Sequence, residues 1–276
     1  MEKKILMIAA DMDGTMMDSD KNISQRTWEA IERAGECGIH VVPASGRLLS
    51  MLPERLKKHP AVRYAVCANG ASVIDVATGE YIYRSGLPKG KVLELVKMFV
   101  SKGMHVDVFA DGASYTWKRD GDLTDGYDME DWVRELVRST RIQVDSLEEL
   151  VMEAGHLERL NFFYKTEEEK CWMCEFFSAD PELVVAESIF CNLEVSSSST
   201  SKGAALSWLA EYLGFTMENV MAIGDGDNDG AMIRMAGLGV AMENALDSIK
   251  EAADVITSSN DEDGVAVAIE KWAIKE

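Results

Sequence analysis

The sequence predicts an α/β protein whose core is a Rossmann-like, doubly wound parallel sheet, with an α+β domain inserted into it. Short, wholly apolar runs recur near both ends of the chain, and each one stops at a polar turn. Such runs are typical of parallel strands, because helices cover both faces of a parallel sheet. Segments with apolar residues at helical spacing alternate with these runs, which favours βαβ connections. Between residues 85 and 190 the strands instead alternate apolar and polar residues, as half-exposed antiparallel strands do.

The N-terminal part of the core, residues 1–84, begins with a strand–helix–strand unit. Ser24 is a suitable N-cap for the helix, in which Trp28, Ile31 and Ala34 share one face. A parallel connection of this kind is right-handed. We expect strands at 5–10, 39–44 and 64–68, helices at 24–38 and 48–58, and a hairpin of 72–75 with 81–83.

The inserted segment, residues 85–190, changes to the pattern of a separate α+β domain. Amphipathic helices alternate with strands that are apolar on one side only. Residues 119–131 are polar and rich in Gly and Asp, which predicts a loop. We expect helices at 88–102, 130–138 and 167–178, and strands at 106–109, 114–117, 160–164 and 184–186. A further strand at 192–195 closes the segment, just beyond its boundary at 190.

The C-terminal part, residues 191–276, returns to the pattern of the core. A short run of serines leads into a helix whose Ala205, Leu206 and Leu209 lie at helical spacing. Because this part again alternates apolar runs with helical segments, we assign it to the same sheet as residues 1–84. We expect strands at 220–223, 237–242 and 254–257, and helices at 202–212, after 245 and at 265–274.

The charge of the chain limits the partners that it can attract. The 276 residues carry a formal net charge of −20, which repels nucleic acid and anionic membranes at long range. We therefore expect a small-molecule partner, and neither nucleic acid nor a membrane. The sequence indicates no particular oligomeric state. An acidic protein that binds an anionic ligand needs local positive charge at its site, and a bound cation meets that need.

The cysteines and the apolar segments indicate a soluble, cytoplasmic protein. The cysteine count of five is odd, and Cys171 and Cys174 form a CxxC pair without a second pair or two histidines to complete a zinc site. We interpret the cysteines as buried free thiols of a reducing cytosol rather than as metal or redox groups. No stretch is long and apolar enough for a signal sequence or a membrane span.

The residues that carry chemistry follow the predicted core strands. Asp11 and Asp13 come directly after the first strand, and Ser45 and Gly46 follow the second. Ligands of open parallel sheets bind at the carboxyl ends of the strands. Ser45 either caps the next helix or donates to a phosphate oxygen, and both roles are compatible because a helix N-terminus attracts anions.

Two further groups occur in the C-terminal part. Lys202 lies at the start of a helix, where its charge opposes the helix dipole, which hints at function against the alternative of a solvated lysine. The fourth strand ends at Asp225 and Asp229. A calcium loop of the EF-hand type would need Glu at its twelfth position, where Ala236 stands, so the sequence does not match one.

These motifs resemble those of the haloacid dehalogenase-like (HAD) phosphatases. Asp-Met-Asp-Gly-Thr at residues 11–15 is similar to their DxDGT nucleophile motif, and Ser45, the Lys202–Gly203 pair and the GDxxND-like segment 224–229 are similar to the second, third and fourth motifs. Ser-Gly-Arg at 45–47 and Asn-Gly-Ala at 69–71 resemble the Cof-type branch. Members of that branch carry a class IIB cap domain at the position of the 85–190 insertion, so the resemblance implies a HAD fold with a cap that sets substrate specificity.

The resemblance also implies the roles of the site residues. Asp11 would be the nucleophile that forms an aspartyl-phosphate, and Asp13 the general acid and then the general base. Mg²⁺ would be held by Asp11, Asp225 and the backbone carbonyl of Asp13, and Asp229 would orient a metal-bound water. The implied phosphate ligands are the Lys202 and Ser45 side chains, the backbone N–H groups of Met12 and Gly46, and Asn228.

The sequence thus predicts a Mg²⁺-dependent phosphatase of a small phosphorylated metabolite, either a sugar phosphate or a nucleotide-like compound. A phosphomutase or phosphotransferase shares Asp11 and Asp13 and is the alternative enzyme, and a binding module without catalysis is the alternative of another class. Lys118 and Arg119, on the predicted loop of the insertion, are the candidates for substrate contact, against the alternative of a solvated loop.

Overall fold

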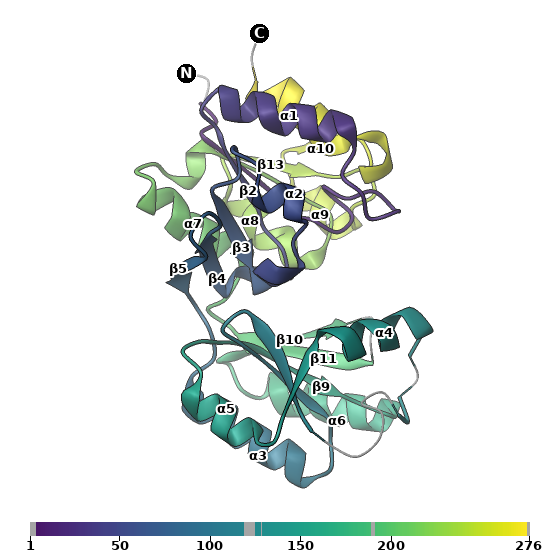
Figure 1. Ribbon diagram of the computed structural model, residues 1–276. Coiled ribbons are helices and arrows are strands. Elements are labelled where there is room, and N and C mark those ends of the chain that lie inside the picture. The colour runs from purple at the N-terminus through teal and green to yellow at the C-terminus, as the bar shows by residue number, and fades with distance from the viewer. Residues whose placement is uncertain (1–3, 119–124, 128, 189–190, 275–276) are drawn as a thin grey trace. The chain divides into compact units, whose positions relative to one another are not determined.

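The computed structural model describes residues 4–118, 125–127, 129–188 and 191–274 and divides into two compact units (Figure 1). Unit 1 comprises Met1–Arg84 and Thr200–Glu276, and unit 2 comprises Ser85–Ser199. Unit 2 ends nine residues later than the predicted boundary of 190. The reason is that strand β11 (Asn192–Ser197) pairs with two strands of unit 2 and with none of the described strands of unit 1.

A five-stranded parallel sheet forms the centre of unit 1, which confirms the predicted core. Its strand order is β14-β13-β12-β1-β2, and every neighbouring pair is parallel. Strands β1, β2, β12 and β13 are wholly or largely buried, as their apolar sequences predict, whereas the edge strand β14 is half-buried to exposed. Their bounds are Met7–Ala10 (β1), His40–Pro43 (β2), Val220–Gly224 (β12), Leu238–Ala241 (β13) and Val255–Ile256 (β14).

Helices cover both faces of this sheet (Figure 1). The chain moves from β1 toward one edge of the sheet, where β2 lies. From β12 it moves toward the opposite edge, through β13 to β14. Because such connections are right-handed, the two directions place their helices on opposite faces. Helix α1 packs on α10, whereas α7 and α9 pack on α8. The helices are α1 (Gln25–Glu36), α7 (Lys202–Tyr212), α8 (Gly230–Met235), α9 (Asp247–Ala252) and α10 (Gly264–Ala268).

Two predicted elements of unit 1 differ in the structure. The helix expected at 48–58 is reduced to a 3₁₀ turn at Leu49–Met51 and to α2 (Glu54–Lys57), because Pro53 lacks an N–H and cannot continue a helix. The third core strand, β3 (Tyr64–Cys67), joins the parallel sheet through a single bridge between Ala44 and Val66. Its main partner is the predicted hairpin, which is confirmed as β4 (Ser72–Asp75) and β5 (Glu80–Arg84).

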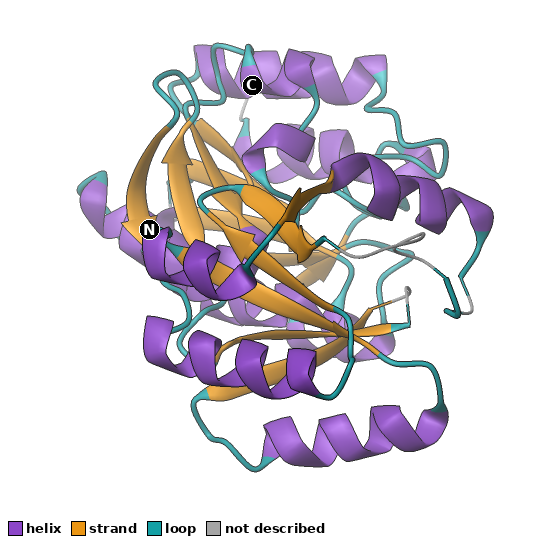
Figure 2. Ribbon diagram, turned by 60° about the horizontal axis from the view of Figure 1, so that its bottom comes forward, coloured by secondary structure: helices purple, strands orange, loops and turns teal. Residues whose placement is uncertain are grey.

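Unit 2 contains a six-stranded sheet in the order β10-β11-β9-β6-β7-β8. All pairs are antiparallel except β7 with β8. Helices α3, α5 and α6 cover one face, where their apolar stripes meet the inward residues of the strands. Figure 2 shows the alternation of helices and strands over the chain. The strands are β6 (Val106–Ala110), β7 (Ala113–Trp117), β8 (Arg141–Val144), β9 (Leu157–Phe163), β10 (Leu183–Ser188) and β11. The helices are α3 (Lys89–Ser101), α4 (Asp131–Thr140), α5 (Leu147–Glu153) and α6 (Glu167–Ser178).

None of the five cysteines, which all lie among the described residues, forms a disulfide, but the expectation that they are buried is wrong for most of them. Cys67 is buried, Cys37 and Cys171 are exposed, and Cys174 and Cys191 are half-buried. Helix α6 turns Met173 and Phe177 toward its sheet, so Cys171 lies away from the core. Within the described part of the chain, no helix combines the length and the apolar character needed to cross a membrane.

A buried polar network on the other face of the unit 2 sheet offers a test of its stability. Asp107, which is fully buried, accepts hydrogen bonds from Arg141 Nε and from the His105 ring, each at 2.8 Å. Thr116 Oγ1 lies 3.0 Å from the same ring nitrogen of His105. Burial opposes ionisation of Asp107, but Arg141 and His105 outweigh it and lower its pKa to about 2.

Replacement of Asp107 by Asn is therefore expected to destabilise unit 2 by about 3–5 kcal/mol at neutral pH, because it strips a buried arginine of its counter-charge. A pKa lowered from 3.8 to about 2 supplies stability above pH 3.8 that is lost as the pH falls toward 2. The gap in melting temperature between the variant and the wild type should thus narrow below about pH 4. Asp145→Asn is the matched control, since that side chain is 92% exposed. Equal melting temperatures at neutral pH would contradict the prediction.

Candidate active site

The strand order brings the predicted residues to one edge of the unit 1 sheet. Strands β12, β1 and β2 are adjacent, so the residues that follow them, Asp225, Asp11 and Ser45, lie at neighbouring carboxyl ends. The backbone continues this pairing beyond the strands, since Asp11 N donates to Ile223 O at 3.0 Å. Asp11 and Ser45 are both buried. The edge is where ligands of open parallel sheets bind.

Lys202 lies at the centre of the site and is completely buried. Its Nζ donates to Asp11 Oδ1 at 2.6 Å and to Asp229 Oδ1 at 2.7 Å. The alternative of a solvated lysine at this position is therefore wrong. A buried ammonium is stable only when paired and hydrogen-bonded, and these two carboxylates provide both conditions.

The position of Lys202 depends on the close packing of its helix against a turn that follows β3. Ser201 caps α7, because its side chain accepts a hydrogen bond from Ala204 N at 3.1 Å. Gly70 packs directly against this cap: a Cβ there would lie 2.2 Å from Ser201 O, and its φ of +101° also favours glycine. Any larger residue at 70 would push the start of α7, and Lys202 with it, out of place.

The loop after β12 holds its two carboxylates in different ways. Asp225 accepts a hydrogen bond from Thr15 Oγ1 at 2.6 Å. Asp229 Oδ2 accepts the N–H groups of Asp225 and Gly226 at 2.9 and 3.0 Å, so both Asp229 oxygens already have donors. Gly14 approaches this loop so closely that a Cβ on it would lie 2.5 Å from Asp225 Oδ2. Its φ of +78° is a further reason for glycine in this turn.

Burial is the largest cause of the pKa shifts of the carboxyl groups at the site, and the neighbouring charges modify its effect. Burial raises the pKa of Asp11 to about 7, and the charge of Asp229 adds to this rise while Lys202 opposes it. Burial would lower the pKa of Lys202, but Asp11 and Asp229 outweigh burial and raise it. Burial also raises the pKa of Asp225, against the hydrogen bond from Thr15. The carboxyl groups of Asp11, Asp225 and Asp229 thus gather at one site with a single ammonium, which cannot balance their charge when all three are ionised.

The same carboxylates fit a divalent cation. One ligand oxygen each from Asp11, Asp225 and Asp229 lies within 4.8 Å of the others. Carboxylate oxygens are the ligands that Mg²⁺ prefers, and a double positive charge would balance the excess that Lys202 leaves. Because the Asp229 oxygens already accept three hydrogen bonds, Asp11 and Asp225 are better placed than Asp229 to serve as direct ligands.

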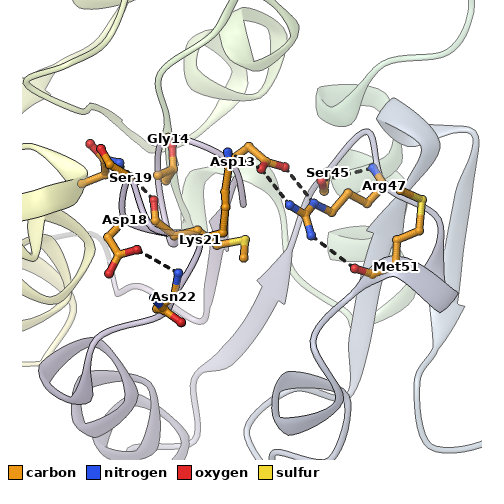
Figure 3. A network of polar contacts seen from close by, with 12 residues as sticks. Asp13, Gly14, Asp18, Ser19, Lys21, Asn22, Ser45, Arg47 and Met51 are labelled. Atoms are coloured by element: carbon orange, nitrogen blue, oxygen red, sulfur yellow. Dashed lines mark hydrogen bonds and ion pairs between the residues drawn. The ribbon is translucent and has the colours of Figure 1, made fainter. Parts of the chain in front are cut away.

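Asp13 lies apart from this cluster and is held by two cations (Figure 3). Arg47 Nε donates to Asp13 Oδ2 at 2.8 Å, and its Nη2 donates to Oδ1 at 2.7 Å. Lys21 Nζ donates to the same Oδ1 at 3.0 Å. Burial opposes ionisation of Asp13, but the hydrogen bonds and charges of Arg47 and Lys21 outweigh it and lower its pKa. Asp13 is therefore ionised and oriented at neutral pH.

The loop that carries Lys21 is fastened on the side away from Asp13. Asn22 N donates to Asp18 Oδ1 at 2.8 Å within the loop (Figure 3). Ser19 donates to Asp261 through both its backbone N–H and its hydroxyl, at 2.8 and 2.7 Å. Lys21 itself has a φ of +63°, in the left-handed region.

The predicted phosphate ligands lie on a second set of connected loops. Ser45 Oγ accepts the Arg47 N–H at 3.2 Å, which leaves its own hydroxyl proton free to donate elsewhere. Asn228 Nδ2 donates to Asn69 Oδ1 at 3.1 Å, and a Cβ on Gly46 would lie 3.0 Å from that same oxygen. Met12 is buried, and its carbonyl accepts the N–H of Met17 at 2.9 Å.

Of the two candidates for substrate contact in unit 2, Lys118 and Arg119, the structure describes Lys118. Lys118 follows β7 and is mostly exposed, with its Nζ 3.8 Å from Asp145 Oδ1. Its backbone N–H donates to Val144 O at 2.8 Å, which extends the pairing of β7 with β8. Arg119 lies outside the described residues.

Four residues that the sequence interpretation gave no role belong to the site: Thr15, Lys21, Arg47 and Asn69. Thr15, Arg47 and Asn69 stand inside the motifs at 11–15, 45–47 and 69–71, and this membership is the signal that the sequence offers for them. Lys21 has no such signal. It is a lysine in a polar turn, and only the folded loop directs it at Asp13.

Comparison with known proteins identifies the family. A family model described as haloacid dehalogenase-like hydrolase matches residues 8–269. The 5-amino-6-(5-phospho-D-ribitylamino)uracil phosphatase YcsE of Bacillus subtilis is 32% identical over 274 residues, or 98% of this chain and 96% of that protein. The pyridoxal phosphate phosphatase YbhA of Escherichia coli is 28% identical, over 94% of this chain and 96% of its own length. A solved haloacid dehalogenase-like hydrolase from B. subtilis has a TM-score of 0.78 at 29% identity and covers 97% of this chain and 99% of its own. The family that the motifs resemble is thereby confirmed, and this chain belongs to the haloacid dehalogenase-like hydrolases.

Proposed function

We propose that this hydrolase is a Mg²⁺-dependent phosphatase that releases phosphate from a small phosphorylated metabolite through an aspartyl-phosphate intermediate. The observation that carries the proposal is the buried triad of Asp11, Lys202 and Asp229 beside Asp225. A nucleophilic carboxylate next to an ammonium and a cation site is the arrangement that phosphoryl transfer requires, because the phosphate charge must be neutralised as the carboxylate approaches.

In the proposed first step, Asp11 attacks phosphorus and the bond to the leaving oxygen breaks. Because Arg47 and Lys21 favour the ionised form of Asp13, this carboxylate must first take up a proton from solvent. It then donates that proton to the leaving oxygen, so that an alcohol rather than an alkoxide departs. In the second step, Asp13 takes a proton from the water that attacks the aspartyl-phosphate. That step breaks the acyl phosphate bond, restores the Asp11 carboxylate and releases inorganic phosphate.

The cation and the phosphate are assigned to separate groups of residues. Asp11, Asp225 and the backbone carbonyl of Asp13 would hold Mg²⁺, and Asp229 would orient a water of its shell. When bound, the cation neutralises the non-bridging phosphate oxygens and removes their repulsion of Asp11. The phosphate would be held by Lys202 and Ser45, and by Asn228 with the backbone N–H groups of Met12 and Gly46.

We assign the choice of substrate to unit 2. The relatives described above are named for phosphorylated ribitylaminouracil and for pyridoxal phosphate, which are both small phosphorylated metabolites. A sugar phosphate or a nucleotide-like compound therefore remains the class that we propose for this chain. A test panel should contain those two compounds, several sugar phosphates and several nucleotides.

Phosphate release across this panel is expected to require Mg²⁺. Removal of the cation by EDTA should abolish turnover, because Asp11 then faces a phosphate dianion with only Lys202 to offset the repulsion. Excess Mg²⁺ should restore the rate. Asp225→Asn should raise the Mg²⁺ concentration at half-maximal rate by about tenfold or more, the cost of losing one charged ligand. Full activity in EDTA would contradict the cation assignment, and transfer to a sugar acceptor without phosphate release would indicate a phosphotransferase.

Replacement of Lys118 by Ala is expected to act on substrate binding and not on the chemistry. We expect KM for the preferred substrate to rise by about three- to tenfold with kcat nearly unchanged, as for the loss of roughly 1 kcal/mol of uniform binding. Steady-state kinetics on that substrate and on p-nitrophenyl phosphate provide the measurement. An unchanged KM for all good substrates would remove Lys118 from the substrate site.

A further inference from the structure

The contact between Arg47 and Asp13 has a geometry that the proposed mechanism does not explain. The arginine uses two adjacent nitrogens, Nε and Nη2, on the two separate oxygens of one carboxylate, at 2.8 and 2.7 Å. Such a fork fixes the plane of the carboxylate as well as its position. A single contact, such as the one from Lys21 Nζ to Oδ1, fixes only a distance.

Arg47 is itself held at both ends of its side chain (Figure 3). Its backbone N–H donates to Ser45 Oγ at 3.2 Å, and its Nη1 donates to Met51 O at 3.3 Å. The side chain is only 23% exposed, against 61% for Lys21. Arg47 therefore presents a fixed fork to Asp13, whereas Lys21 reaches it from solvent on a flexible stem.

We propose that Arg47 is a positioning residue: it orients the Asp13 carboxylate for proton transfer and is not a ligand of the phosphate. This inference rests on the proposed function, in which Asp13 donates a proton to the leaving oxygen and later takes one from water. The fork occupies one lone-pair direction on each oxygen, and Lys21 takes the second direction of Oδ1. The second direction of Oδ2 is therefore the one that can carry the proton or accept one. Both proton transfers can thus occur without release of the arginine.

The two possible roles of Arg47 predict different responses to the leaving group. A general acid matters more when the leaving oxygen is more basic, so phenyl phosphate depends on Asp13 more than p-nitrophenyl phosphate does. A phosphate ligand contributes to both substrates alike, since both present the same phosphate. The ratio of kcat/KM for the two aryl phosphates therefore separates orientation of Asp13 from binding of phosphate.

The test uses the whole protein with Mg²⁺ and the variants Arg47→Gln and Arg47→Lys. We expect the loss of kcat/KM to be about tenfold larger with phenyl phosphate than with p-nitrophenyl phosphate. A factor of about ten is part of the rate enhancement that a general acid usually provides. The Arg47→Lys variant should recover little of the lost kcat/KM, because a lysine cannot donate two parallel hydrogen bonds to one carboxylate. The inhibition constant of inorganic phosphate should be the same in both variants as in the wild type. Arg63→Gln is the matched control, since Arg63 also donates two hydrogen bonds to one aspartate, Asp75, outside the site.

Each outcome decides the inference. Equal losses on both substrates, together with weaker inhibition by phosphate, would overturn it and make Arg47 a phosphate ligand. An unchanged ratio in both folded variants would also overturn it. No turnover of either aryl phosphate by the wild type with Mg²⁺ would overturn the proposed function, and the inference with it, so the two failures are distinguishable.

Discussion

Replacement of Asp11 by Asn is expected to reduce phosphate release by about 10⁴-fold or more, the scale on which loss of the nucleophile acts in other covalent enzymes. An amide has nearly the shape of the carboxylate but cannot attack phosphorus and form an acyl phosphate. Lys202 keeps one partner in this variant, since it also donates to Asp229 Oδ1 at 2.7 Å. The fold should therefore survive while the chemistry is lost.

The measurements for Asp11→Asn are phosphate release under saturating substrate and the mass of the rapidly quenched protein. The wild type should show a fraction of molecules heavier by one phosphoryl group, and the variant should show none. The control is Asp247→Asn, at an exposed aspartate in the first turn of α9. Turnover of Asp11→Asn near the wild-type rate would rule out the covalent mechanism.

Replacement of Lys202 by Met is expected to have the second large effect, on stability as well as on turnover. Methionine has a similar length and no charge, so Asp11 and Asp229 would remain buried without the ammonium that both contact. Breaking a buried ion pair in this way costs about 3–5 kcal/mol. We expect a melting temperature lower by several degrees and no measurable phosphatase activity.

The destabilisation of Lys202→Met should depend on pH in a defined direction. Burial already raises the pKa of Asp11 from 3.8 to about 7 while Lys202 opposes the rise, so removal of the lysine should raise it further. A carboxyl group with a raised pKa in the folded state disfavours folding above its unfolded pKa, and not below it. The difference in melting temperature between Lys202→Met and the wild type should therefore shrink as the pH falls from 7 toward 4. Lys58→Met, at an exposed ion pair with Glu54, is the matched control and should show no such trend. A difference in melting temperature that stays constant over this pH range would contradict the role of Lys202 as the charge partner of the buried Asp11.

Much of the fold follows from local patterns. The apolar runs at residues 5–10 and 220–223 are strands because no other short element hides such a run on all sides, and both pair in parallel with buried neighbours. Local rules also explain one error, since Pro53 breaks the helix predicted across it. The extent of unit 2 did not follow from local patterns, because the place of β11 depends on its pairing with β9 and β10, which are distant in sequence.

By itself, the sequence determined which residues stand at the carboxyl ends of the core strands and, through their motifs, the family. Only the tertiary structure decided how these residues act on one another. Lys202 is separated from Asp11 by 191 positions, and it becomes a buried partner because α7 packs against the turn at Gly70. Arg47 and Lys21 converge on Asp13 from two different loops. The physical reason is that charge, burial and hydrogen bonds act through space, whereas periodicity and turn chemistry report only on near neighbours along the chain.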